Sequence, residues 1–84
     1  MTHALKTEPI YFRSIVEGVK TFEVRRADRE FKVGDQLLLQ EYDPSKDKYT
    51  GQEWKGEITY LMDDSTGYCK KGYCIFCIKE KENV

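Results

Sequence analysis

The chain has 84 residues, a formal net charge of −1 and charged and hydrophobic fractions of 35% and 39%, which together indicate one solvated globular domain over residues 1–84. No apolar run approaches the roughly 20 residues that a membrane-spanning helix requires, and the N-terminus lacks the apolar core of a signal peptide. Three cysteines cannot all pair within the chain, which argues against a disulfide-stapled scaffold. The absence of a membrane-spanning run argues against a membrane protein. Together these features predict a cytoplasmic protein.

The chain is expected to open with a short strand and a helix. Residues 3–6 form the expected strand. The sequence Thr7-Glu8-Pro9 then predicts a helix start, because Thr or Glu can cap a helix and proline is suited to its first turn. Apolar residues recur at helical spacing over residues 10–17, and Gly18 is the expected end of the helix.

The next element, residues 20–26, alternates with a period of two and is predicted to be a strand. Alternate side chains of a strand point to opposite sides, which places Thr21, Glu23 and Arg25 on one side and Phe22, Val24 and Arg26 on the other. We expect the apolar pair in the second set to hold the strand in the core. The first set is then a polar face.

The rest of the chain predicts three strands joined by two polar, turn-rich loops. The strands cover residues 36–42, 53–62 and 73–78, and the loops cover residues 43–51 and 63–72. The leucines of the first of these strands predict burial on both sides. In the second, Gly56 permits a bend or bulge, and the alternation puts Ile58 and Tyr60 on the same side as Trp54 and Met62. The charged tail from about residue 79 is expected to fray.

Five short strands with one early helix predict an α+β domain that is mainly β. We expect a small, mostly antiparallel β-barrel of about five strands with the helix packed beside it, since closure removes exposed sheet edges.

Basic residues are concentrated in the first part of the chain. All four arginines lie between residues 13 and 29, three of them in the run GVKTFEVRRADR over residues 18–29. Such a cluster can bind an anion, whereas the isoelectric point of about 5.8 argues against indiscriminate binding to long duplex DNA. A Glu23-x-Arg25 pair is most often a surface ion pair contributing roughly 0 to 1 kcal/mol, but here it follows a glycine that permits close approach of a ligand.

The residues from Gly18 to Arg25 match the pattern G-x-K-x-x-E-x-R, and through them the chain resembles the ASCH (activating-signal-cointegrator homology) domains of the PUA-like superfamily. With HALKT at residues 3–7 and VGDQLLLQEYD at residues 33–43, it is similar over nearly its whole length to a small phage and bacterial family within that group. The resemblance implies a β-barrel, a helix beside it, and a cleft between them that binds RNA or a nucleotide. Its fixed positions correspond to Lys20, Glu23 and Arg25. Physically plausible residues for the rim of the cleft are Arg26, Asp28 and Arg29.

These residue types suit a nucleotide. An arginine fork binds phosphate through two hydrogen bonds, lysine adds a compact charge, and a carboxylate accepts from a base amino group or a ribose hydroxyl. Aromatic side chains can stack on bases; we expect Trp54 in the core, while Tyr42 and Tyr60 suit either role. The sequence therefore predicts a monomeric RNA- or nucleotide-binding module that needs no cofactor.

Two other functions stay open. Some ASCH-like proteins act as amidohydrolases on acylated cytidine or cleave RNA with a lysine, a threonine and a glutamate, which here implies Lys20 as base, Thr21 as nucleophile and Glu23 as the orienting group. The amidohydrolase threonine lies three residues after the lysine, where this chain has Glu23, and strand alternation points Lys20 away from Thr21. The third possibility is a phage or bacterial protein-interaction module, whose aromatic and arginine surface meets a host protein.

A few remaining side chains have ligand chemistry. His3 and Lys6, in the HALKT start, and Tyr42 are secondary candidates for the cleft, although a lone histidine is more often structural. The Cys74-x-x-Cys77 spacing suggests zinc, but residues three apart in a strand face opposite sides, so buried thiols are the better interpretation. Asp63-Asp64 lacks a further ligand pattern. We therefore predict no metal site.

Overall fold

The computed structural model describes residues 1–81 and shows one five-stranded sheet with a single α-helix early in the chain. In chain order the elements are β1 (Thr2–Thr7), α1 (Pro9–Val16), β2 (Phe22–Arg26), β3 (Gln36–Asp43), β4 (Lys48–Asp63), the 3-10 helix η1 (Asp64–Thr66) and β5 (Tyr73–Glu80). The prediction of a mainly β domain with an early helix is confirmed. Within residues 1–81 no helix has the length and apolar character to cross a membrane.

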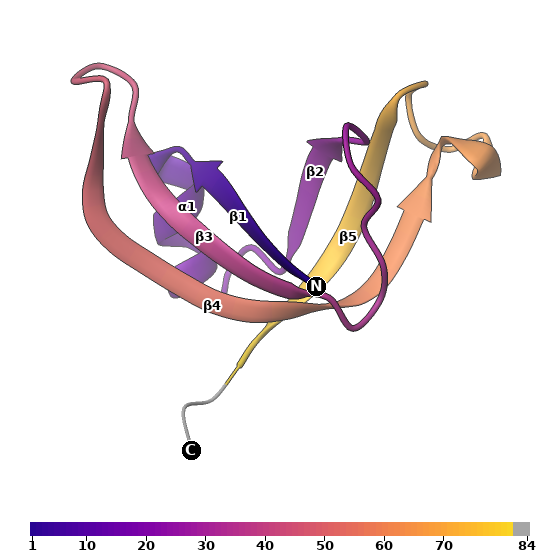
Figure 1. The fold of residues 1–84 in the computed structure, drawn as a ribbon, viewed down its shortest axis with the longest axis horizontal. Helices are drawn as coiled ribbons and strands as arrows, with labels where there is room; N and C mark the ends of the chain where they lie inside the picture. Colours follow the sequence, from indigo (N-terminus) through magenta and orange to yellow (C-terminus); the bar gives the residue numbers. More distant parts are fainter. Residues whose placement is uncertain (82–84) are drawn as a thin grey trace.

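The sheet has the order β1-β3-β4-β5-β2 and curls into a half-barrel (Figure 1). β1 runs parallel to β3, and the other neighbours are antiparallel. The long β4 lies along the base of the curl and pairs with both β3 and β5, so the two edge strands, β1 and β2, stand in opposite arms (Figure 1). No backbone ladder joins β1 to β2 in the described part of the chain. The half-barrel therefore has a seam between these strands.

The hydrophobic core is formed by one face of the sheet and by α1. Its members are Leu5, Phe12, Ile15, Phe31, Leu37, Leu39, Trp54, Ile58, Cys74, Phe76 and Ile78. The core position of Trp54 is confirmed, and Gly56 allows it: a Cβ atom built on Gly56 would lie 2.3 Å from the Trp54 ring and 2.5 Å from the Lys79 carbonyl oxygen. The prediction that β3 is largely buried on both sides agrees with the structure: Leu37 and Leu39 are in the core, and Leu38 on the opposite face is partly buried.

A β-bulge changes which side chains of β4 face the core. Ile58 pairs with Ile78 but Tyr60 pairs with Cys77, so one extra residue is inserted in β4. Ile58 is 1% exposed, whereas Tyr60 is 61% exposed. The expectation that both lie on one side is therefore wrong; Leu61 packs against the core instead.

The element boundaries differ from the expected ones at three places. β4 begins at Lys48, inside the predicted loop, because the Tyr42 and Tyr49 pair extends the β3–β4 hairpin. Lys79 and Glu80 continue β5 by pairing with β4, so the expected frayed tail does not begin at residue 79. Residues 82–84 of that predicted tail lie outside the described residues.

The orientation of β2 is opposite to the expected one. Phe22 and Val24 are 42% and 55% exposed, whereas Glu23 between them is only 4% exposed and pairs with the core residue Phe76. The polar face of β2 therefore points into the half-barrel, and the expected core role of Phe22 and Val24 is wrong. Alternation separates the two faces of a strand, but it does not say which face meets the core.

Candidate functional site

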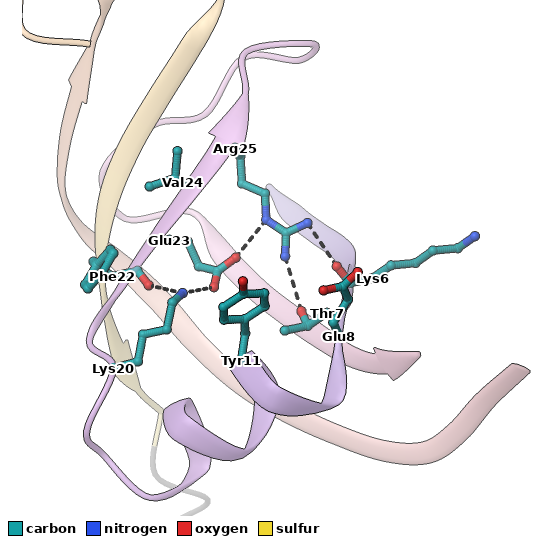
Figure 2. Close-up of a pocket in the computed structure, with 9 residues that line it drawn as sticks. All are labelled: Lys6, Thr7, Glu8, Tyr11, Lys20, Phe22, Glu23, Val24 and Arg25. Carbon is teal, nitrogen blue, oxygen red and sulfur yellow. Dashed lines mark hydrogen bonds and ion pairs between the residues drawn. The ribbon is translucent and has the colours of Figure 1, made fainter. Parts of the chain in front are cut away.

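Glu23 is a buried carboxylate that binds two cations (Figure 2). Lys20 Nζ donates to Glu23 Oε1 at 2.5 Å, and Arg25 Nε donates to Glu23 Oε2 at 2.7 Å. Charge-assisted hydrogen bonds to both oxygens offset the desolvation of the carboxylate. The expectation that Lys20 points away from the polar face is wrong, because Lys20 precedes β2 and strand alternation does not apply to it.

The end of α1 positions Lys20. Gly18 has a left-handed φ of 77°, and the backbone N–H groups of Val19 and Lys20 both donate to the carbonyl oxygen of Ser14 at 3.0 Å. A glycine in this conformation ends a helix and turns the chain back over its last turn. The expected helix stop at Gly18 is thus confirmed. The Lys20 side chain then reaches the Phe22 carbonyl oxygen at 2.7 Å as well as Glu23.

Arg25 bridges the seam between the two edge strands. From β2, its guanidinium donates to the Lys6 carbonyl oxygen at 2.9 Å and to Thr7 Oγ1 at 3.2 Å, both on β1. Figure 2 shows this guanidinium between Glu23 on one side and the end of β1 on the other. The side chain therefore joins the two arms of the half-barrel where a backbone ladder would do so in a closed barrel.

A first cavity of about 490 Å³ opens between α1, β1 and β2 (Figure 2). It is lined by Lys6, Thr7, Glu8, Tyr11, Lys20, Phe22, Glu23, Val24 and Arg25. The Tyr11 and Phe22 rings are partly exposed, and Lys20 Nζ lies 5.7 Å and 4.9 Å from their respective centroids. Aromatic faces and paired charges thus meet in one cavity.

A second cavity of about 450 Å³ contains the other arginines of the run. It is lined by Ala4, Leu5, Lys6, Arg25, Arg26, Asp28, Arg29, Phe31, Gln40 and Tyr49. Lys6 and Arg25 line both cavities, so they stand between the two. Lys6 Nζ also lies 4.5 Å from the centroid of the Tyr42 ring and 5.8 Å from that of Tyr49.

The structure brings together most of the predicted site residues. Lys20, Glu23 and Arg25 share the first cavity; Lys6, Arg26, Asp28 and Arg29 line the second. Tyr42 contacts Lys6 without lining either cavity. Thr21 is exposed and lines neither.

His3 lies apart from both cavities, in a buried polar cluster. Its Nε2 is 2.7 Å from Asp35 Oδ2, and its ring packs against Phe31 with centroids 4.7 Å apart. Asp35 also accepts from the Lys32 backbone N–H at 3.0 Å and faces the Met1 amino group at 3.5 Å. The hydrogen bond from His3 lowers the pKa of Asp35. The structure thus gives His3 a packing role rather than a place in the cleft.

The cysteines do not form a metal site within residues 1–81, where no cluster of three or more His, Cys, Asp or Glu side chains could hold an ion. Cys74 is buried, and burial raises the pKa of its thiol. Cys77 is exposed, so the expectation of buried thiols is wrong for this residue. It faces away from the core because it lies three residues from Cys74 in the same strand.

The sequence interpretation missed several residues of the first cavity, chiefly Thr7 and Tyr11. Thr7 alternates with His3 and Leu5, a signal that places it on the inner face of β1. The helical spacing places Tyr11 in the apolar stripe of α1, but only Phe12 and Ile15 of that stripe are buried. A tyrosine beside the buried stripe is the residue type expected to carry a half-exposed ring.

The fold and the site together define a small β half-barrel with charged cavities along the seam between its edge strands. Residues 2–78 match the family described as "Domain of unknown function (DUF3850)", and the chain belongs to that family. A relative in Escherichia phage P2, the "Uncharacterized 12.9 kDa protein in GpA 3'region", is 34% identical over 61 residues, which are 73% of this chain and 54% of that protein. The chain therefore matches about half the length of this curated relative.

Proposed function

We propose that the protein is an RNA- or nucleotide-binding module whose ligand enters the two cavities at the seam. The observation that carries this proposal is the charge of the seam. Five cationic side chains and three carboxylates line the two cavities, although the whole chain has a net charge of −1. The cations are Lys6, Lys20, Arg25, Arg26 and Arg29, and the carboxylates are Glu8, Glu23 and Asp28. A concave site with this excess attracts an anion.

Arg25 and Glu23 are paired with each other, yet both keep hydrogen-bonding groups that a ligand can use. Arg25 uses three of its N–H groups within the protein, and a guanidinium has more donors than these. Each oxygen of Glu23 accepts one hydrogen bond and has a further lone pair for a base amino group or a ribose hydroxyl. The exposed faces of Tyr11 and Phe22 offer surfaces for stacking.

The resemblance to ASCH domains of the PUA-like superfamily supports the same proposal. The three charged residues that match G-x-K-x-x-E-x-R, namely Lys20, Glu23 and Arg25, all line the first cavity. A monomeric binding unit is part of the proposal. A cytoplasmic location, where RNA and nucleotides are abundant, is part of the proposal.

The hydrolase alternative has less geometric support, because the expected nucleophile Thr21 lines neither cavity. A protein-interaction module has one observation in its favour. A third cavity of about 600 Å³ is lined by Val24, Met62, Tyr68, Cys69, Lys70, Tyr73, Cys74 and Ile75. Two of these apolar side chains, Val24 and Tyr68, are exposed. Capture of a protein partner that survives nuclease treatment and is lost on Tyr68→Ser, at a residue that lines only the third cavity, would favour this function over RNA binding.

The affinity of the protein for a short single-stranded RNA tests the proposal. Arg26 is exposed, lines the second cavity and forms no ion pair with residues 1–81, so Arg26→Ala removes a cation without breaking a contact. Arg13→Ala is the matched control, since Arg13 is exposed on α1 and lines neither cavity. We expect Arg26→Ala to weaken RNA binding several-fold in fluorescence anisotropy and Arg13→Ala to leave it unchanged. Equal affinities of the two variants would contradict the proposal.

A further inference from the structure

The two cavities of the seam differ in chemistry. The first has the partly exposed Tyr11 and Phe22 rings, with the Glu23 carboxylate among its lining groups. The second has Arg26 and Arg29 and only one carboxylate, Asp28, and its one exposed ring, Tyr49, already packs against Tyr42 and the Lys6 amino group. Aromatic faces bind planar bases by stacking, whereas guanidinium groups bind phosphate. The first cavity thus suits the base of a nucleotide, and the adjacent second cavity suits its phosphate.

The groups that separate the cavities are suited to the linking part of such a ligand. Arg25 is fixed in place by hydrogen bonds to Glu23, Thr7 and the Lys6 backbone. A ligand that occupies both cavities would pass beside Arg25 and Lys6, because both residues line both cavities. A ribose between base and phosphate presents hydroxyl and ether oxygens to such donors.

The sizes of the two cavities suit a small ligand. Volumes of about 490 and 450 Å³ fall within the range of small-molecule sites, roughly 300 to 1,000 Å³, and the cavities adjoin at Lys6 and Arg25. A duplex read by shape and backbone needs a long continuous surface. The seam is short and is bridged by the Arg25 side chain, so it does not offer a surface of that kind.

From these observations we infer that the seam binds one nucleoside monophosphate unit, with its base in the first cavity and its phosphate in the second. The inference rests on the proposed function and adds the position and size of the ligand. A free nucleotide and an unstacked nucleotide of an RNA share this chemistry. Two residues therefore contribute separately to the binding affinity. Tyr11 contacts the base, and Arg29 contacts the phosphate.

Calorimetric titration with the four ribonucleosides and their 5′-monophosphates separates the two contributions. We expect Tyr11→Ala to weaken the best-bound nucleoside and its monophosphate alike by about tenfold, the order of one lost stacking contact. Tyr11→Phe keeps the ring and should retain binding. Arg29→Ala should weaken the monophosphate about fivefold and leave the nucleoside unchanged, because a nucleoside has no phosphate for the second cavity.

Matched controls are available for both changes. Tyr68→Ala removes a tyrosine that is 87% exposed and lines only the third cavity, and Arg13→Ala removes an arginine outside all three cavities. Neither control should change either affinity. Thermal unfolding of each variant tests whether the exposed substitutions leave the fold intact.

A short single-stranded RNA, titrated in parallel, distinguishes the source of the nucleotide. Tighter binding of the RNA than of the free monophosphate assigns the site to an unstacked nucleotide of RNA, and the reverse order assigns it to a free nucleotide; both results support the inference. Binding of RNA with no binding of any monophosphate would overturn the inference and leave the proposed function standing. Equal losses of nucleoside and monophosphate in Arg29→Ala would also overturn it. Failure of RNA and every monophosphate to bind would overturn both proposals.

Discussion

Arg25 has one role that the structure shows and one that we propose. We propose a ligand contact because it matches a fixed position of the ASCH pattern, whereas two of its hydrogen bonds hold β2 to β1 and a third binds Glu23 within β2. Its loss leaves the buried Glu23 with only Lys20 as a charged partner. A binding defect in an Arg25 variant therefore cannot by itself identify a ligand contact, and Arg26 and Arg29 are the better test positions.

We predict that Arg25→Ala lowers the free energy of unfolding by about 3 kcal/mol, the order found when one partner of a buried ion pair is removed. Urea denaturation measures the change. Arg26→Ala is the control in the neighbouring position; as an exposed substitution it should change stability by no more than about 0.5 kcal/mol. Equal stability of Arg25→Ala and Arg26→Ala would contradict the bridging role.

The Asp35 carboxylate predicts a pH dependence of stability. The His3 hydrogen bond lowers the pKa of Asp35 in the folded protein, so this group stabilises the fold above its ordinary pKa of about 4. The contribution is lost as the pH falls through the lower, folded-state pKa. Asp35→Asn should cost about 2 kcal/mol near neutral pH, because a buried charged hydrogen bond is removed.

Urea unfolding of the wild type and of Asp35→Asn at a series of pH values checks this prediction. The difference in stability should shrink as the pH falls below about 4. Asp43→Asn is the comparison, because Asp43 also has a lowered pKa, held by Ser45, but it lies at the end of β3 beside the hairpin turn and not in the buried cluster. A difference for Asp35→Asn that stays constant to the lowest pH would show that its carboxylate charge does not stabilise the fold.

At the scale of elements, the centre of β4 depends on the close approach of Trp54 and β5 to Gly56. A methyl group at Gly56 would lie inside the contact distance of both the Trp54 ring and the Lys79 carbonyl oxygen, and backbone cannot move aside as a flexible side chain does. We predict that Gly56→Ala costs about 2 kcal/mol, the order of an overpacked core.

Thermal and urea unfolding of Gly56→Ala measure this cost. Gln52→Ala, at an exposed position of the same strand, should change stability by less than about 0.5 kcal/mol. A Gly56→Ala variant as stable as the wild type would mean that β4 and β5 have room to separate at this point.

The elements themselves could be predicted from local signals, whereas their orientation could not. Gly18 ends the helix as its conformational freedom implies, and the alternation of residues 20–26 marks a strand. The same alternation does not tell which face is inward, because that depends on whether a charged residue finds partners. Glu23 finds Lys20 and Arg25, and so the carboxylate is buried while Phe22 is partly exposed.

At the scale of the whole molecule, the site arises from the way the sheet curls. β1 and β2 are far apart in the sheet order, yet the curl brings them to the two sides of one seam, where Arg25 joins them (Figure 1). The pattern in residues 18–25 predicted one wall of the cleft. Alternation places Thr7 on the inner face of β1, but its meeting with Tyr11 and β2 in one cavity depends on tertiary contacts between distant segments.

The salt dependence of RNA binding tests the central claim most directly. If the cations of the seam bind phosphate, the logarithm of the affinity for a short single-stranded RNA should fall linearly with the logarithm of the salt concentration, by roughly 0.7 per phosphate contact. Arg26→Ala should bind more weakly with a shallower slope, and Arg13→Ala should follow the wild type. Affinity that does not change with salt, or a slope that Arg26→Ala leaves unaltered, would contradict the claim that this seam binds the RNA backbone.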